Sequence, residues 1–157
     1  RLERVTDSNS LAQVIVDYAH TPDALGNALV ALRQHTSKRL ICVFGAGGER
    51  DKGKRKIMGQ VADELADLCL ITDDNPRNEN PKRIRDQILE GCPNGESIAG
   101  RGEAIKLGIS KLKSGDLLLV AGKGHESTQE INGQKFEFSD VEVVKNLIKN
   151  AEGLNHE

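Results

Sequence analysis

Three short polar segments of this sequence carry residues that could do chemistry. Residues 73–77 (DDNPR) place two carboxylates, an amide and a guanidinium within five positions, and residues 122–126 (GKGHE) end on Glu126. A site for a zwitterion needs carboxylates that accept hydrogen bonds from an ammonium, and a guanidinium that donates two parallel bonds to a carboxylate. The acids and the arginine of the first segment, together with Glu126, are residues of these types. Turns also favour Asp, Asn, Pro and Gly, so an ordinary solvated turn remains the alternative for each segment.

The third segment, residues 48–55 (GERDKGKR), fits the GxxxxGK frame of a phosphate-binding loop and follows an apolar run. Arg55 stands where such a loop needs a Ser or Thr oxygen for magnesium. Three interpretations stay open: a true phosphate-binding loop, a solvated turn, and an anion-facing loop of another design in which Arg50 grips a carboxylate or phosphate. The residues alone also leave His20 open between a ligand contact and an ordinary packed or exposed histidine. No spacing of Cys, His and acidic residues matches a zinc site, so we expect no metal site.

The elements that must position these segments alternate along the chain. Apolar runs rich in branched residues are followed by segments of helical period, which predicts an α/β fold. We expect a mostly parallel sheet of about six strands flanked by helices, with a C-terminal hairpin that turns at Asn132-Gly133. The predicted strands are residues 13–17, 39–44, 68–72, 97–99 and 116–121, and the hairpin covers residues 129–138. Five helices are predicted. The first follows Thr21-Pro22, the second carries Ile57, Met58, Val61 and Leu65, and the third runs from Asn80-Pro81 to near Gly91. The fourth covers residues 103–113, and the fifth follows a capping box of Ser139 and Glu142.

The polar segments all follow predicted strands. In a parallel sheet the carboxyl ends of the strands lie along one edge, where ligands of open α/β sheets bind. We therefore expect His20, Arg50, Asp74 and Glu126 to converge on one pocket, although about a hundred residues separate the first from the last.

Composition narrows the function classes. The chain has 157 residues, which suits one domain, and its net charge of −2 and 3% aromatic content give no reason to expect a nucleic-acid partner. The apolar runs are far shorter than the roughly 20 residues that cross a bilayer, and the first residues lack a signal peptide, so we expect no membrane contact. Two of the three cysteines lie in apolar runs, which predicts reduced thiols and a cytoplasmic location. The sequence does not begin with Met, so we expect a piece of a longer chain.

Four segments, in order along the chain, resemble the C-terminal domain of the Mur ligases. They are residues 17–25 (DYAHTPDAL), 43–55 (VFGAGGERDKGKR), 72–77 (TDDNPR) and 120–126 (VAGKGHE). The resemblance extends from about Arg1 to Ile148 and implies a Rossmann-like domain that binds an incoming amino acid. In the reaction that it implies, ATP phosphorylates the free carboxylate of UDP-N-acetylmuramoyl-L-alanyl-D-glutamate. The amine of the amino acid then attacks the acyl phosphate, giving a peptidoglycan precursor.

The segment DNPR, residues 74–77, is similar to that of Mur ligases that add meso-diaminopimelate, whereas lysine-adding members usually lack the arginine. The resemblance therefore implies meso-diaminopimelate as the ligand. Asp17 and His20 match the motif that meets the nucleotide across a domain interface. The implied substrate-binding residues are Arg50, Asp74, Asn75, Arg77, Gly122 and Glu126, with Pro76 shaping the loop.

The resemblance also implies which parts of the enzyme are missing. ATP and Mg²⁺ would be bound mainly by a central domain, and the UDP-N-acetylmuramoyl dipeptide by an N-terminal domain together with it. We expect residues 1–157 to form one C-terminal domain that is inactive alone, and we leave the role of Arg101 open. Two other interpretations remain: a self-sufficient nucleotide hydrolase that uses residues 48–54, and a noncatalytic α/β nucleotide-binding module.

Overall fold

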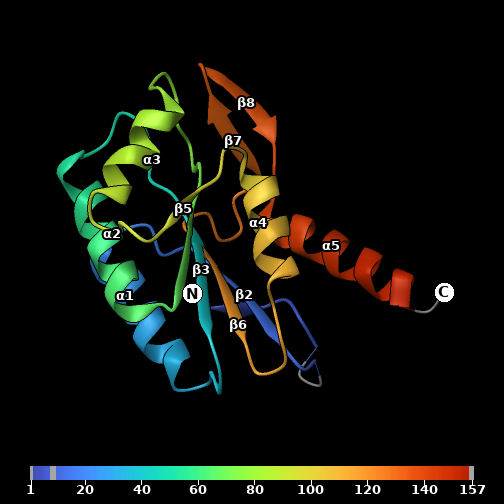
Figure 1. The fold of residues 1–157 in the computed structure, drawn as a ribbon. Helices are drawn as coiled ribbons and strands as arrows, with labels where there is room; N and C mark the ends of the chain where they lie inside the picture. Colours follow the sequence, from blue (N-terminus) through green and yellow to red (C-terminus); the bar gives the residue numbers. More distant parts are fainter. Residues whose placement is uncertain (1, 8–9, 156–157) are drawn as a thin grey trace.

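The fold is built on a six-stranded sheet in the order β1-β2-β6-β3-β4-β5 (Figure 1). The computed structural model describes residues 2–7 and 10–155. All neighbouring strands of this sheet are parallel except β1, which runs antiparallel to β2. The strands are β1 (Glu3–Arg4), β2 (Gln13–Asp17), β3 (Leu40–Phe44), β4 (Leu68–Ile71), β5 (Glu96–Ser97), β6 (Leu117–Ala121), β7 (Thr128–Ile131) and β8 (Gln134–Glu137). The predicted α/β class and mostly parallel sheet are confirmed, whereas the two-residue β1 was not predicted.

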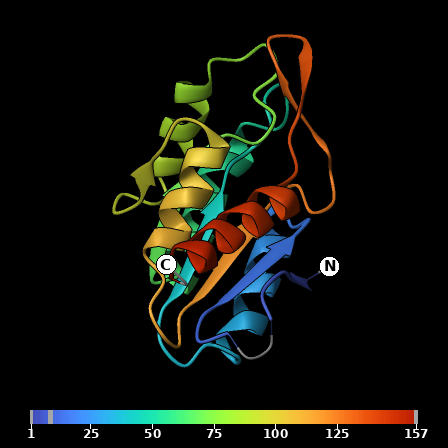
Figure 2. The ribbon, with the colours of Figure 1, turned by 90° about the vertical axis from the view of Figure 1, so that its right-hand side faces the viewer.

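Helices cover both faces of the sheet (Figures 1 and 2). Strand β3 shows why: Leu40, Cys42 and Phe44 pack with α1, α2 and α3, while Ile41 and Val43 pack with α4 and α5. Successive side chains of a strand point to opposite faces, so a strand covered on both sides is apolar throughout. The helices are α1 (Pro22–Arg33), α2 (Gly53–Leu65), α3 (Pro81–Leu89), α4 (Arg101–Ser110) and α5 (Asp140–Asn155).

Three helices begin where the sequence predicts. The Thr21 hydroxyl accepts a hydrogen bond from the Ala24 amide, the Asn80 side chain accepts one from the Lys82 amide, and Ser139 Oγ accepts one from the Glu142 amide. Such caps satisfy amide groups that lack partners within the helix. Helix α4 differs from its prediction of residues 103–113, because it begins at Arg101 and ends at Ser110.

Helix α2 packs Met58, Val61 and Leu65 against the core, as the sequence indicates, but leaves Ile57 at the surface. The Ile57 side chain is 47% exposed, whereas the Arg55 side chain is buried. The helix approaches α3 closely at Gly59, where an added Cβ would lie 2.1 Å from the Ile88 carbonyl oxygen. A side chain larger than glycine at this position would push the two helices apart.

The C-terminal hairpin of β7 and β8 forms as predicted. Asn132 and Gly133 have φ angles of 52° and 74°, the two positive values that a type I′ turn requires. The hairpin is a separate two-stranded sheet, joined to the loop after β4 by a bridge between Arg77 and Ile131. It therefore braces that loop.

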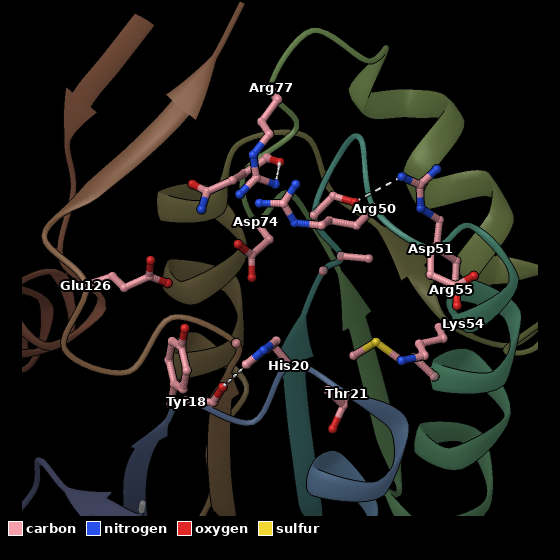
Figure 3. Close-up of a pocket in the computed structure, with 16 residues that line it drawn as sticks. Tyr18, His20, Thr21, Arg50, Asp51, Lys54, Arg55, Asp74, Arg77 and Glu126 are labelled. Carbon is pink, nitrogen blue, oxygen red and sulfur yellow. Dashed lines mark hydrogen bonds between the residues drawn. The ribbon is translucent and has the colours of Figure 1, made fainter. Parts of the chain in front are cut away.

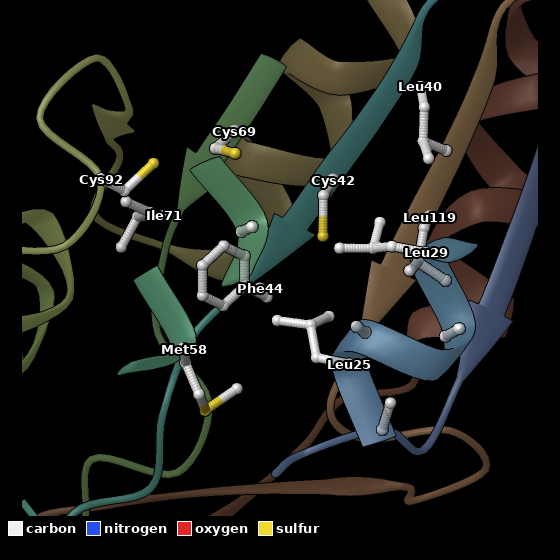
Figure 4. Close-up of a cluster of buried hydrophobic side chains, with 14 of the residues drawn as sticks. Leu25, Leu29, Leu40, Cys42, Phe44, Met58, Cys69, Ile71, Cys92 and Leu119 are labelled. Atoms are coloured by element: carbon white, nitrogen blue, oxygen red, sulfur yellow. The ribbon is translucent and has the colours of Figure 1, made fainter. Parts of the chain in front are cut away.

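The three cysteines are free and buried in the core beneath α1 to α3 (Figure 4). Cys42 and Cys69 are register partners on β3 and β4. Burial raises the pKa of all three thiols, which keeps them protonated and unreactive, in line with the predicted reduced state. Among the described helices, none combines the length and the apolar character needed to cross a membrane.

The contrast between two helical isoleucines gives a test of the packing. Ile105 is fully buried in α4, so Ile105→Ala should lower the free energy of unfolding by about 2–5 kcal/mol. Ile57→Ala should cost roughly 0.5 kcal/mol or less, because half of that side chain already faces water. Urea unfolding of the two variants measures both values. Equal losses would contradict the assigned faces.

Candidate functional site

A cavity of about 370 Å³ lies at the carboxyl ends of the parallel strands (Figure 3). The loops after β2, β3, β4 and β6 all contribute to its lining. Of the residues predicted to bind substrate or nucleotide, all except Pro76 and Asp17 lie in the lining. The predicted residues that line it are His20, Arg50, Asp74, Asn75, Arg77, Gly122 and Glu126, and among those not predicted are Tyr18, Thr21, Lys54 and Met58.

The cavity is lined by charged side chains of both signs. The guanidinium groups of Arg50 and Arg77 lie near each other, with Asp74 beneath them and Glu126 extending from another loop (Figure 3). Both arginines crowd Gly47: a Cβ there would lie 2.9 Å from Arg77 Nη1 and 3.4 Å from Arg50 Cγ. Two neighbouring cations repel each other, so the cavity favours a ligand that brings negative charge to this end.

The loop after β4 is held in an unusual conformation. Arg77 has a φ of 55°, and its amide donates to the Glu130 carbonyl at 2.9 Å while its carbonyl accepts from the Asn132 amide at 2.7 Å. The guanidinium donates from Nη1 to the Gly48 carbonyl at 2.9 Å, and its Nε lies 3.5 Å from a Glu130 carboxylate oxygen. Backbone and side chain together aim Arg77 at the cavity.

The structure gives the neighbouring carboxylates of Asp73 and Asp74 different positions, which the sequence alone could not distinguish. Asp73 pairs with Arg85 at 2.6 Å outside the cavity lining, whereas Asp74 lines the cavity. Gly122 is required beside Asp74, because its φ is 121° and a Cβ there would lie 2.6 Å from Asp74 Oδ2. Pro76 is buried behind the cavity with its carbonyl against Gly48, where an added Cβ would lie 1.9 Å from that oxygen.

The pair predicted to meet a nucleotide occupies two different positions. His20 is exposed at the cavity, and its Nδ1 lies 2.9 Å from the Tyr18 carbonyl. Asp17 is buried below, where its carboxylate accepts from the Ala19 amide at 2.9 Å and its carbonyl accepts from the Gly122 amide at 3.0 Å. Asp17 therefore shapes the turn that carries His20.

The GxxxxGK segment does not form a phosphate cradle. The Gly48 amide donates to the Asn75 carbonyl, and the Glu49 amide donates to the Glu79 carboxylate. The amides of Gly53 and Lys54 both bond to Asp51. A phosphate-binding loop needs such amides free for the phosphate, and the residue after the lysine offers no oxygen for magnesium. Residues 48–55 therefore do not fit a self-sufficient ATP–Mg²⁺ site.

Two buried arginines support the site and were not predicted to do so. Arg55 donates to both Glu79 carboxylate oxygens and to the Gly47 carbonyl, at 2.8–2.9 Å. Arg101 forms two 2.7 Å bonds to Asp140 and also donates to the carbonyls of Asp73 and Ala121. Arg55 thus fixes the loop after β3, and Arg101 fixes the ends of β4 and β6.

The fold and the cavity define an α/β ligand-binding domain, and sequence comparison gives the family. Residues 1–124 match the family model described as "Mur ligase, glutamate ligase domain", so the chain belongs to the Mur ligase family. It is 54% identical over 149 residues to the UDP-N-acetylmuramoyl-L-alanyl-D-glutamate--2,6-diaminopimelate ligase of Chelativorans sp. (strain BNC1), and 53% identical over 154 residues to the ligase of that name from Rickettsia montanensis. Each match covers 95% of this chain and 31% of the relative. The chain thus spans about a third of the length of these relatives.

Solved structures agree with the sequence comparison. A structure of a UDP-N-acetylmuramoyl-L-alanyl-D-glutamate--2,6-diaminopimelate ligase superposes with a TM-score of 0.91 at 41% identity, covering 97% of this chain and 32% of that one. E. coli FolC in complex with ADP superposes with a TM-score of 0.61 at 19% identity, covering 100% of this chain and 32% of that one, which shows a shared fold. The predicted family and Rossmann-like fold are confirmed.

The Arg55–Glu79 pair generates a pH-dependent prediction. Hydrogen bonds from Arg55 and from the Glu49 amide lower the pKa of Glu79 from 4.5 to about 2. A carboxylate whose pKa is lower in the folded protein than in the unfolded chain contributes its full stabilisation at pH values above the pKa of the unfolded chain. For Glu79 that contribution is lost as the pH falls from 4.5 to about 2. Glu79→Gln should cost roughly 1–3 kcal/mol at pH 7 and flatten the decline in stability across that range.

The matched control is Asp86→Asn, which breaks a pair with Lys82 whose side chains are 51% and 73% exposed. It should cost less than about 0.5 kcal/mol. Urea unfolding at a series of pH values measures both effects. An acid profile for Glu79→Gln that matches the unsubstituted protein would show that the pair does not anchor the loop.

Proposed function

We propose that this chain is the amino-acid-binding domain of a ligase that adds meso-diaminopimelate to UDP-N-acetylmuramoyl-L-alanyl-D-glutamate. The observation that carries the proposal is the sharing of one cavity by Arg50 and Arg77 with Asp74 and Glu126. The relatives at 53–54% identity are named for this same reaction. Asn75 and Gly122 complete the proposed substrate site, and Pro76 shapes its loop.

The charges of the cavity match those of the proposed ligand. Diaminopimelate carries two carboxylates and two amines, which suits two guanidinium groups and two carboxylates. Lysine has the same amines but lacks one carboxylate, so it would leave one arginine without an anionic partner. Sites that hydrogen-bond a ligand group reject analogues that lack it by large factors, because their own polar groups are then left unpaired.

The remainder of the proposed ligase would supply the other substrates. ATP with Mg²⁺ and the UDP-linked dipeptide would bind mainly to the domains that precede this one, because the residues after β3 do not fit a phosphate cradle. This domain would bind the amino acid, orient its amine, and present His20 to the nucleotide at the domain interface, with Asp17 holding the turn. Such an enzyme would act in the cytoplasm on a peptidoglycan precursor. The occupied amides of Gly48, Glu49, Gly53 and Lys54 argue against a self-sufficient nucleotide hydrolase.

The test uses the full-length ligase with Arg77→Lys. A lysine keeps the charge but cannot donate two parallel bonds, so kcat/KM for diaminopimelate should fall by about 100-fold or more. The ratio of diaminopimelate addition to lysine addition should fall with it. Product formation from each amino acid, measured separately, gives both numbers.

Arg83→Lys is the control, since Arg83 is exposed on α3 and outside the cavity lining. It should leave both rates unchanged. If the Arg77→Lys enzyme kept its preference for diaminopimelate over lysine, the proposed assignment of this cavity would be wrong.

A further inference from the structure

The buried lysine between the two glycines after β6 is not accounted for by the proposed contacts. We propose that Lys123 is a positioning residue for amino-acid recognition, which fixes Asn75 as a hydrogen-bond donor toward a ligand carboxylate. This inference rests on the proposed function, because it concerns the same cavity. Lys123 itself lies outside the cavity lining and would act from beneath it.

Lys123 occupies an environment that is costly for an ammonium. Its side chain is fully buried, and the flanking glycines adopt φ angles of 121° and 57°, which place this residue inside the fold. Burial lowers the pKa of Lys123, while the charge of Asp74 opposes that change. The other charged groups that act on it are Arg101 from α4, Asp140 from α5 and Glu126 from its own loop. A lysine is almost never fully buried unless its ammonium is paired or hydrogen-bonded.

The side chain that accepts a hydrogen bond from the Lys123 ammonium is Asn75. Lys123 Nζ donates to Asn75 Oδ1 at 3.0 Å, and the Glu130 amide donates to the same oxygen at 3.0 Å. An amide oxygen has two lone pairs, so these two donors occupy both. The orientation of the Asn75 side chain is thereby fixed by its network, with the oxygen turned to the protein and the NH₂ group left for other partners.

The consequence concerns the polarity of the site. Asn75 lines the cavity, so its NH₂ group is the part available to a ligand, and an NH₂ group can only donate. It therefore adds to the donors of Arg50 and Arg77 at the carboxylate-binding end of the cavity. Lys123 Nζ also lies 4.0 Å from Asp74 Oδ1, which leaves Asp74 Oδ2, beside Gly122, for a ligand ammonium. The buried ammonium thus orients a donor of the site, Asn75, and lies beside an acceptor of the site, Asp74.

The first experiment measures steady-state kinetics of the full-length ligase with Lys123→Met, which keeps the length of the side chain but removes its charge and its donor. The KM for diaminopimelate should rise by about 10-fold or more, while the KM values for ATP and for the dipeptide substrate stay within about 2-fold. Lys106→Met is the matched control, since Lys106 is exposed on α4, and it should change none of these values. If Lys123 had only a structural role, the substitution would lower kcat without a selective rise in the KM for diaminopimelate, or it would leave all three KM values unchanged. Either result would overturn the inference.

The second variant, Asn75→Asp, keeps the fold-supporting contacts, because a carboxylate oxygen can accept from both Lys123 and Glu130. It replaces the proposed donor by an acceptor, so the KM for diaminopimelate should rise by about 10–100-fold through repulsion of the ligand carboxylate. Unchanged or tighter binding would show that Asn75 accepts from a ligand ammonium, which would overturn the inference. If Arg77→Lys weakens diaminopimelate addition but Lys123→Met and Asn75→Asp do not, this inference fails while the proposed function stands. If all three leave it unchanged, the proposed function fails as well.

Discussion

The buried ion pair between Arg101 and Asp140 is the interaction on which the rest of the site depends. Neither side chain is exposed, and the guanidinium reaches the carbonyls of Asp73 and Ala121 as well as the carboxylate. Burial lowers the pKa of Arg101, but the charge and hydrogen bonds of Asp140 more than offset this, so the pKa is raised and the cation is kept. The two parallel hydrogen bonds from Arg101 to Asp140 offset part of the large cost of removing both charges from water. A single side chain on α4 therefore joins the ends of β4 and β6 to the first residue of α5.

This junction matters because of the order of the strands. Strand β6 lies between β2 and β3, yet the chain that leaves it goes to the hairpin and α5, whereas the chain that leaves β2 and β3 goes to α1 and α2 on the other face. Loops that diverge from neighbouring strands leave a crevice between them, which is where ligands of α/β sheets bind. Arg55 and Arg101 act on either side of that crevice, and the hairpin fixes Arg77 from above. The loops are thus held by one another as well as by the sheet.

The sequence predicted the helices and strands well, but it did not predict the buried charged residues that hold the loops of the site, and the reason is physical. Strands, caps and the type I′ turn follow from local patterns, and the convergence of Arg50, Asp74 and Glu126 follows from parallel topology alone. Supports such as Arg101 depend on a partner 39 residues away, and Lys123 depends on a partner 48 residues away. A charged residue in a sequence normally indicates solvent, and only the fold shows which are buried. The same reason applies to Arg55, whose carboxylate partner Glu79 lies 24 residues away.

Five of the arginines divide into two classes by the partners that the fold gives them. Arg55, Arg85 and Arg101 each have a carboxylate from the protein, and these pairs fix loops. Arg50 and Arg77 face the cavity instead, with the Arg77 Nε 3.5 Å from a partly exposed Glu130, so their charge is less fully compensated. Under the proposed function, a diacid without amines would suit these two arginines but would meet Asp74 and Glu126 as like charges, and a diamine would meet the two arginines as like charges. The diaminopimelate ligand proposed above would bring two carboxylates to this cavity, so its recognition would depend most on the two arginines that have no full partner in the protein.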